Sequence, residues 1–379
     1  MITGEKISFA FIGDTMVGGD FIAFAKKHNI ELLHPFRAIK PNLFNTDLCF
    51  VNLEGPIFEG SDKRSDVTTL LSNHPKILDL FNVDHLCVFN LANNHIMDYG
   101  VEGLNHTIAL LKKNNLNYLG AGNNDREANQ ALIVECKGKR IAFVAYTSDE
   151  KHVGSIIAGP QRPGCASFLD VTKATRRVAE LKQKTDIVCV SLHWGHEYLQ
   201  YPSPKQIEIA HAFVDAGANF VIGHHPHVIQ GIEKYKDALI IYSLGNFFFP
   251  PVRSTSGRPQ YQKEITKEFM IITSGMDAAM NIEFSCLGGT VNDGFAMTPF
   301  DDQTPFLTKI SRLSEQLCCQ NYKEFWGNYK DRREKQLIRE SLSEAFNKLR
   351  LMTFKDLIST VKLSDIKRNL ERFYSLLTK

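Results

Sequence analysis

The chain has 379 residues, 43% of them hydrophobic, and a formal net charge of only +2. This length allows one large buried core plus an additional segment. The near-neutral charge argues against nucleic-acid binding, and no apolar run approaches the roughly 18 residues of a membrane span. The eight cysteines lack regular spacing, which predicts reduced thiols. Because no signal peptide precedes the first strand, we expect a cytoplasmic protein.

Apolar segments that stop abruptly at polar residues recur along the first 250 residues. These segments are Ile7–Gly13, Leu48–Val51, Leu86–Phe89, Ile187–Leu192, Val221–Gly223 and Ile240–Ser243. Such runs are typical of strands buried on both faces of an α/β sheet. Ligand groups of open α/β sheets lie beyond the carboxyl ends of the strands. The pattern therefore predicts that six strand ends converge on one rim of one sheet.

The residues that follow these strands include types that bind divalent metal ions. Carboxylates, neutral oxygens and imidazoles together can hold one or two such ions. The predicted metal ligands are Asp14, Glu54, Asn94, His193, His225 and His227. The predicted surrounding pocket residues are Asn52, Asn93, His196, Glu197, His224 and Asn246. We expect Mn, Zn or Fe as the cofactor, and the composition does not distinguish among them.

Several of these residues also have ordinary structural interpretations. Asp14 fits a helix cap and Glu54 fits a turn carboxylate, while Asn93 is more typical of a turn former than of a ligand. His196 and Glu197 either bind metal or only surround the pocket. The set of residues taken together is therefore stronger evidence for a metal site than any one of them.

His95 is the predicted catalytic residue because it follows the predicted ligand Asn94 directly. An imidazole in that place is suited to protonate a leaving group or to stabilise a transition-state charge. The alternative is a structural hydrogen bond from His95 to the backbone.

Six motifs in order along the chain resemble the CapA/PgsA family, and the match covers about residues 6–250. They are Gly13-Asp14, Asn52-Leu-Glu54-Gly-Pro56, Ala92-Asn-Asn-His95 with Asp98-Tyr-Gly100, His193-Trp-Gly195 with Glu197-Tyr198, Gly223-His-His-Pro-His227 and Ser243-Leu-Gly-Asn-Phe247. That family is associated with poly-γ-glutamate capsule production and is related to calcineurin-like metallophosphoesterases. The resemblance implies a four-layer α/β/β/α sandwich.

The same resemblance implies roles for individual residues. Asp14 matches the first metal ligand of the phosphoesterases, and Glu54 stands in place of their bridging aspartate. Asn94-His95 matches their Asn-His pair and His193 the next ligand. His225-Pro-His227 has the spacing of the last ligand pair, although Gly223-His224 aligns equally well.

One departure from the phosphoesterase pattern concerns the second ligand of the first motif. Met16 occupies that position, and a thioether does not replace a hard-metal ligand. The departure predicts that one of two metal ions is weakly bound or absent.

The pattern changes after residue 300, which predicts a domain of residues 1–300 followed by a helical extension of residues 301–379. Leu307, Ile310, Leu313 and Leu317 keep helical spacing, as do Leu337, Leu342, Phe346 and Leu349. The extension carries 16 Lys and Arg against 11 Asp and Glu, a solvated basic face rather than a nucleic-acid surface. We expect it either to pack on the core or to hold a protein partner. The polar stretch 254–267 predicts a mobile flap or a disordered loop.

These observations predict a metal-dependent hydrolase. Its substrate would be a phosphoester, or an amide in a small glutamate-like molecule, a glutamyl polymer or a peptide. The alternative is a non-catalytic assembly component of a capsule or polyglutamate synthesis machinery, which would keep the same fold.

Overall fold

The computed structural model describes residues 6–58, 60, 63–82, 85–148, 150–255 and 263–351. The chain divides into two compact units, residues 1–323 and 324–379. The predicted site residues all lie in the first unit. Within the described ranges, no helix combines the length and the apolar character that crossing a bilayer requires.

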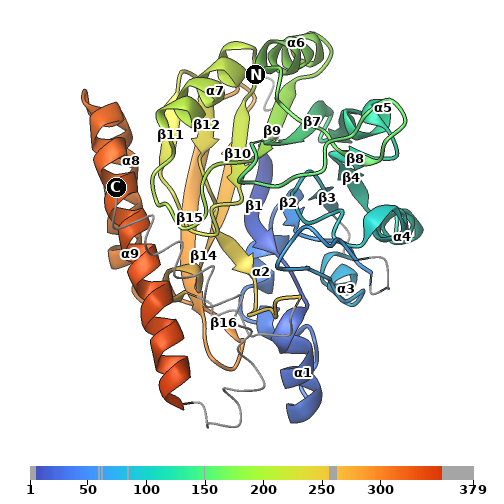
Figure 1. Cartoon of the computed structure of the whole chain (residues 1–379). Coiled ribbons are helices and arrows are strands. Elements are labelled where there is room, and N and C mark those ends of the chain that lie inside the picture. Colours follow the sequence, from blue (N-terminus) through green and yellow to red (C-terminus); the bar gives the residue numbers. More distant parts are fainter. Residues whose placement is uncertain are drawn as a thin grey trace. The chain divides into compact units, whose positions relative to one another are not determined.

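The first unit is built on two mixed β-sheets (Figure 1). The order in the larger sheet is β16 (Met297–Pro299), β15 (Ile282–Val291), β14 (Glu268–Met276), β1 (Ile7–Thr15), β2 (Leu48–Leu53), β3 (Leu86–Asn90) and β4 (Asn117–Leu119), with β13 (Asn246–Phe248) paired to the end of β1. The order in the smaller sheet is β11 (Ile232–Tyr235), β12 (Ala238–Ile241), β10 (Phe220–His224), β9 (Ile187–His193), β7 (Lys139–Thr147) and β6 (Leu132–Cys136). Strands β5 (Ala121–Gly122) and β8 (Gly164–Cys165) form a separate two-stranded sheet.

The two sheets pack face to face. Alternate side chains of β1 point to opposite faces of the larger sheet, and one set of them faces the smaller sheet. Phe9 and Phe11 pack on Phe220 of β10, with ring centroids 5.1 Å apart in both pairs. These residues belong to one buried apolar cluster between the sheets. Ala10 and Ile12 belong instead to a second cluster, on the outer face of the larger sheet. Both faces of β1 are therefore buried, as its continuous apolar sequence predicts.

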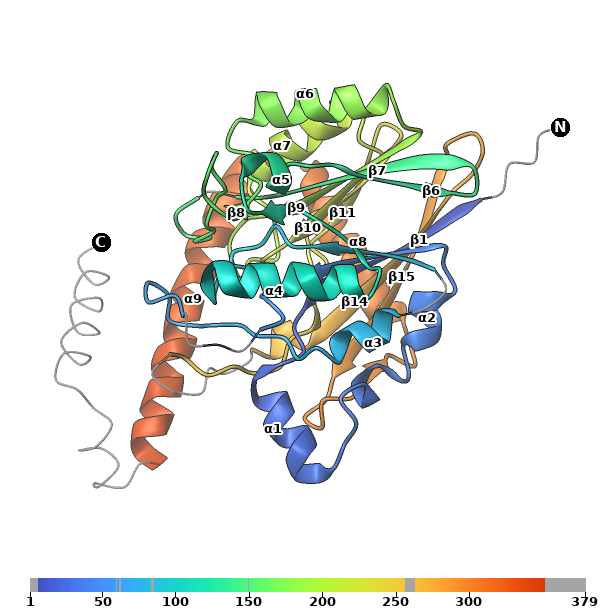
Figure 2. The same cartoon turned by 90° about the vertical axis from the view of Figure 1, so that its right-hand side faces the viewer.

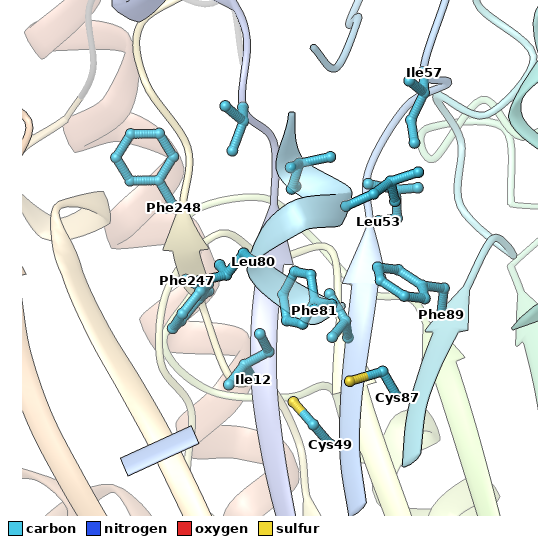
Figure 3. Packing of buried hydrophobic residues seen from close by; sticks show 14 of the residues in the cluster. Ile12, Cys49, Leu53, Ile57, Leu80, Phe81, Cys87, Phe89, Phe247 and Phe248 are labelled. Carbon is cyan, nitrogen blue, oxygen red and sulfur yellow. The ribbon is translucent and has the colours of Figure 1, made fainter. Parts of the chain in front are cut away.

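Helices cover the outer faces of both sheets (Figure 2). The second cluster joins Ile12, Cys49 and Phe89 of the larger sheet to Phe81 of a short helix, and Figure 3 shows these side chains together. The helices of the first unit are α1 (Gly19–His28), α2 (Lys40–Phe44), α3 (Ile77–Phe81), α4 (Gly100–Lys113), α5 (Asp125–Ala128), α6 (Val171–Lys182), α7 (Pro204–Asp215) and α8 (Thr304–Glu315). Helix α6 packs on β9 and α7 on β10. The four-layer α/β/β/α sandwich predicted for this chain is confirmed.

The remaining elements are short turns of 3₁₀ helix and one long helix. The 3₁₀ turns are η1 (His34–Phe36), η2 (Glu264–Thr266) and η3 (Gln316–Cys318), and the long helix is α9 (Tyr322–Leu351). Residues 256–262 of the predicted flap and the side chains of Leu342, Phe346 and Leu349 lie outside the described residues.

Helix α8 belongs with the first unit, although it follows residue 300. Phe306 and Ile310 join the apolar cluster between the sheets, while Leu307 is 41% exposed. The side chain of Gln303, just before the helix, bonds both backbone groups of Gly288 in β15. We therefore propose that the helical extension begins near residue 324 rather than at residue 301.

Candidate metal centre

The strand ends that carry the predicted ligands meet at one rim, but they come from both sheets. Strands β1 and β2 of the larger sheet lead to Asp14 and Glu54, and β9 and β10 of the smaller sheet end in His193 and His224. The prediction of a single sheet was wrong. Face-to-face packing, rather than pairing within one sheet, brings these ends together.

Asp14 is fixed near the end of β1 by a close backbone approach. A Cβ atom at Gly13 would lie 2.0 Å from the carbonyl oxygen of Gly245, so only glycine fits there. The Asp14 amide donates to that same oxygen over 2.9 Å. Asn52 Nδ2 donates to Asp14 Oδ1 over 2.8 Å, which holds the buried carboxylate in place.

The histidine-rich loop after β10 wraps around this carboxylate. The His225 amide donates to Asp14 Oδ2 over 3.2 Å, and His224 Nδ1 lies 3.4 Å from Asp14 Oδ1. His225 and His227 have φ angles of 96° and 57°, in the left-handed region that non-glycine residues seldom adopt. Strain of this kind concentrates at functional sites, because the surrounding structure must enforce it.

Within the part of the chain that the structure describes, two groups of side chains have the spacing of a cation site. Donor atoms of Asp14, Glu54 and His227 lie within 4.8 Å of one another, as do those of Glu197, His225 and His227. His227 Nε2 lies 3.6 Å from Glu54 Oε1, and its Nδ1 lies 3.3 Å from Asp14 Oδ2. His227 is therefore common to both groups. Glu197, predicted as a pocket residue, is exposed and belongs to the second group.

Several buried oxygen and nitrogen atoms of the centre make no hydrogen bond within the described residues. Both carboxylate oxygens of Glu54 and both ring nitrogens of His224 and His225 have no hydrogen-bond partner within the described residues. The same is true of His193 Nδ1. Buried polar atoms in proteins are normally paired, since an unpaired one costs its full desolvation free energy. A donor set of carboxylates and imidazoles in this condition fits a divalent metal ion.

Asn94 and His193 lie against each other beside the second group. Asn94 Oδ1 is 2.8 Å from His193 Nε2, and the His193 ring centroid is 4.8 Å from that of His225. Burial holds the pKa of His193 well below its usual range, so its imidazole is neutral, the form that binds metal. Their predicted role as ligands stays a prediction.

Asparagine side chains hold Asp14 in place through a chain of hydrogen bonds. Asn52 Oδ1 accepts from Asn90 Nδ2 over 3.0 Å, which orients the Asn52 amide towards Asp14. Asn93 Oδ1 accepts from the backbone amides of Gly55 and His95 over 3.3 Å in each case. These backbone bonds match the turn-former interpretation of Asn93. Asn90 was missed, although it directly follows the predicted strand Leu86–Phe89.

Two other predicted residues have clear places at the rim. Asn246 Oδ1 lies 2.9 Å from His227 Nδ1, so Asn246 orients that ring. The His196 ring stacks on that of His152, with centroids 4.3 Å apart, at the side of the pocket. Met16 is fully buried in an apolar cluster with Leu71 and Val252. Its side chain therefore packs among apolar residues, and the predicted weak or absent second ion stays a prediction.

The charges in the centre are strongly coupled. Burial, together with the charge of Asp14, raises the pKa of Glu54 to about 8. Burial disfavours the charged form of His227, but the charges of Glu54 and Asp14 outweigh it and raise that pKa to about 10. Burial also disfavours ionised Asp14, yet the adjacent His224 and His227 hold the pKa of Asp14 well below its usual range. Without metal, Glu54 and His227 as a pair therefore bind more protons near neutral pH than the two isolated side chains would.

We expect the metal-free protein to lose stability as the pH rises from about 6.5 towards 10. Glu54 and His227 have folded-state pKa values of about 8 and 10, above their ordinary values of 4.5 and 6.5. The folded state thus binds more protons than the unfolded state in this window, and rising pH favours unfolding. Scanning calorimetry of chelator-treated protein at pH 6.5, 7.5 and 8.5 measures the change in melting temperature.

The Glu54→Gln variant is the matched control, since it removes one titrating group and the main charge that raises the pKa of His227. Its melting temperature should vary less with pH. An equal slope in both proteins would contradict the prediction.

A pocket of about 500 Å³ opens onto the centre. Its lining includes His95, Glu197, His227 and Asn246. This volume is typical of sites that bind small molecules. The centre is therefore open to a substrate of that size.

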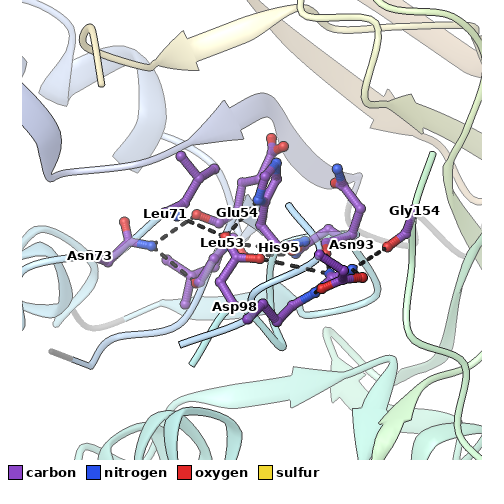
Figure 4. A network of polar contacts seen from close by, with 12 residues as sticks. Leu53, Glu54, Leu71, Asn73, Asn93, His95, Asp98 and Gly154 are labelled. Atoms are coloured by element: carbon purple, nitrogen blue, oxygen red, sulfur yellow. Dashed lines mark hydrogen bonds and ion pairs between the residues drawn. The ribbon is translucent and has the colours of Figure 1, made fainter. Parts of the chain in front are cut away.

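His95 lies in this pocket on a polar network that reaches Leu71, in the loop before α3 (Figure 4). Its Nδ1 is 2.7 Å from Oδ2 of the buried Asp98, which also accepts from the Leu71 amide over 2.7 Å. Arg64 lies 3.9 Å from the other Asp98 oxygen and donates to the carbonyl oxygen of Asn94. Burial disfavours charged His95, but Asp98 and then Glu54 raise its pKa overall. Asp98 thus holds the His95 ring in one orientation.

The fold and the rim define a class of protein, an α/β/β/α sandwich with a candidate metal centre at the strand ends. The sequence profile of the family described as "Bacterial capsule synthesis protein PGA_cap" matches residues 8–251. The chain belongs to this family.

Individual relatives agree with the family. Over 251 residues the chain is 34% identical to the capsule biosynthesis protein CapA of Bacillus anthracis, covering 65% of this chain and 60% of that protein. Over 247 residues it is 33% identical to the PGA biosynthesis protein CapA of Bacillus subtilis, covering 65% and 64%. The matched region thus spans less than two thirds of these relatives' own length. Among solved structures, a phosphatase from Mycoplasma pneumoniae is similar, with a TM-score of 0.46 and 14% identity, covering 76% of this chain and 94% of that one.

Proposed function

We propose that this protein is a metal-dependent hydrolase in capsule or poly-γ-glutamate metabolism. Its substrate would carry a phosphoester, or an amide in a small glutamyl molecule, a glutamyl polymer or a peptide. The carrying observation is the set of buried donors without hydrogen-bond partners, on Glu54, His193, His224 and His225. A purely structural core has no reason to retain these costly groups at strand ends that face a pocket.

The residues that would hold the metal are those of the two donor groups, with His193 and Asn94 adjacent. A divalent ion bound there would supply Lewis-acid activation of water and of the substrate. The mixed oxygen and nitrogen donors suit Mn, Fe or Zn. Asp14 and Asn52 orient the carboxylate side of the centre, and Asn246 orients His227.

His95 would deliver the proton that the leaving group needs. Asp98 accepts from Nδ1 of the ring, so the Nε2 proton is the one available for transfer. Burial disfavours charged His95, but Asp98 raises its pKa overall, which favours the form of the ring that carries this proton. The oxygen or nitrogen of the leaving group would take up this proton while the bond from that atom to phosphorus or carbon breaks.

The second candidate, a non-catalytic component of capsule or polyglutamate synthesis, is favoured by Met16. Its burial among apolar side chains removes one donor that the phosphoesterase motif provides. Such a protein would keep the fold and lack turnover.

A panel of substrates separates the two functions. The purified full chain is analysed for bound Mn, Fe and Zn, and is then assayed with an aryl phosphomonoester, a phosphodiester and a γ-glutamyl anilide. We expect at least about one equivalent of metal and turnover in one substrate class that a chelator abolishes. If all three stay at background with metal present, the assembly component is the better interpretation.

A further inference from the structure

Residues 71–74, in the loop before α3, contact the backbone that follows β1 and the backbone that follows β2. The His74 amide donates to the carbonyl oxygen of Val17 over 2.7 Å. The Asn73 amide donates to the carbonyl oxygen of Pro56 over 2.8 Å. This short segment therefore lies against the chain just beyond both carboxylates of the first donor group.

The Asn73 side chain is buried in this segment, and its oxygen and its nitrogen both form hydrogen bonds. Asn73 Oδ1 accepts from the Val17 amide over 2.8 Å. Its Nδ2 donates to the carbonyl oxygens of Glu54 and Gly55 over 3.0 and 3.1 Å (Figure 4). Asn73 is only 1% exposed, so these bonds are shielded from competition by water. One side chain therefore connects the backbone after β1 to the backbone at Glu54.

These bonds fix the main chain from which the Glu54 carboxylate projects. Hydrogen bonds within the described residues do not orient that carboxylate, since neither of its oxygens has a partner there. The main chain of Glu54 is held from two sides, because its amide donates to the Thr15 carbonyl oxygen over 3.0 Å and its own carbonyl accepts from Asn73. The position of this carboxylate relative to Asp14 therefore depends on Asn73.

The same segment also contacts the partner of the predicted catalytic residue His95. The Leu71 amide donates to Asp98 Oδ2 over 2.7 Å, and that oxygen lies 2.7 Å from His95 Nδ1. Leu71 and Asn73 are two residues apart in the chain. A short stretch of backbone thus joins the Glu54 side of the centre to the pair of His95 and Asp98 (Figure 4).

We infer that Asn73 is a positioning residue of the metal centre, which keeps the Glu54 carboxylate within reach of the ion that Asp14 and His227 would bind. Asn73 acts through the backbone of Glu54 and Gly55 rather than as a ligand. An asparagine amide offers an acceptor and two N–H donors, which match one backbone amide and two carbonyl oxygens here. The inference rests on the metal centre of the proposed function.

Calorimetric titration of the metal-free full chain with Mn²⁺ tests this role without requiring turnover. Asn73→Ala removes all three side-chain bonds and should weaken Mn²⁺ binding by about tenfold, the lower end of the effect of removing outer partners of metal ligands. A residue that only stabilises the loop would lower the melting temperature and leave the Mn²⁺ affinity of the folded protein unchanged. Each variant is therefore titrated well below its own melting temperature.

Asn73→Asp provides a second variant of nearly the same size. Its carboxylate can still accept from the Val17 amide but cannot donate to the carbonyl oxygens of Glu54 and Gly55. The added negative charge would by itself attract a cation. Weaker Mn²⁺ binding, which we expect, would therefore report a displaced Glu54 and not a lost charge. This variant decides the question if Asn73→Ala does not fold.

Two control variants remove comparable hydrogen bonds that do not reach the centre. Ser72→Ala, next to Asn73, removes a bond of 2.9 Å to the carbonyl oxygen of Phe58. Asn114→Ala, at the end of α4, removes a bond of 2.8 Å to the carbonyl oxygen of Leu110. Both variants should bind Mn²⁺ as tightly as wild type.

The outcomes keep this inference apart from the proposed hydrolase. If the folded Asn73 variants bind Mn²⁺ as tightly as wild type, or if the control variants are weakened equally, the positioning role is overturned. If only the Asn73 variants bind weakly and Mn²⁺-loaded wild type hydrolyses none of the three substrate classes, the positioning role stands and the proposed hydrolase fails.

Discussion

An Asp14→Asn variant is expected to fold normally but to bind divalent metal at least about 100-fold more weakly than wild type, and to lose its hydrolytic turnover. Replacing even the outer partners of metal ligands costs about 10- to 100-fold in affinity, and Asp14 is placed as a direct donor. The amide keeps the size of the carboxylate and can still accept from Asn52. It lacks the negative charge that His224 and His227 face. Elemental analysis and a competition assay with a chelator measure the affinity, and circular dichroism reports the fold.

His225→Ala provides a sharper version of this experiment. Asp14 belongs to the first donor group only, and His225 to the second only. If the centre holds two ions, His225→Ala should lose about one equivalent and retain the other. Asp215→Asn, at the end of α7, is the matched surface control. Unchanged metal affinity in Asp14→Asn would contradict the assignment of the centre.

The second large effect is expected at His95. His95→Ala should lower kcat by about a hundred- to ten-thousandfold, the usual contribution of a general acid. Its metal content should be unchanged, because His95 belongs to neither donor group. His28→Ala, on the exposed end of α1, is the control. If turnover survives in His95→Ala, the enzyme class stands and the assignment of the acid is wrong.

The pH dependence of activity tests the assignment of His95 as the acid in a way that misfolding would not reproduce. A general acid must be protonated, so activity should fall as the pH rises through the pKa of His95. Asp98 raises that pKa, and Asp98→Asn should therefore move the alkaline limb of the profile to lower pH. An unmoved limb would show that another group donates the proton.

Much of the rim could be predicted from the sequence because its signals are local. An apolar run of the length of Ile7–Gly13 requires burial on both faces, and the polar residue that ends it must lie at a sheet edge. Asp14, Glu54 and His227 each follow such a run, and the structure brings them within 4.8 Å. No knowledge of strand order was needed for this result.

The contacts that were not predicted join residues that are distant in sequence or depend on packing. Asp98 is three residues from His95, but its bond to the Leu71 amide depends on how the loop before α3 folds back onto it. Glu197 joins His225 only because the ends of β9 and β10 lie side by side. Periodicity in α8 identifies a helix, but it does not state that Phe306, rather than Leu307, enters the core.

His227 makes the two halves of the centre dependent on each other. Because the same imidazole belongs to both donor groups, an ion that binds one group changes the donors left for the other. This effect is reciprocal, so the metal affinity of each donor group depends on whether the other group is occupied. A metal titration should therefore show unequal successive steps rather than two identical ones. The difference in affinity of the first donor group between wild type and His225→Ala, in which the second group is incomplete, measures this coupling.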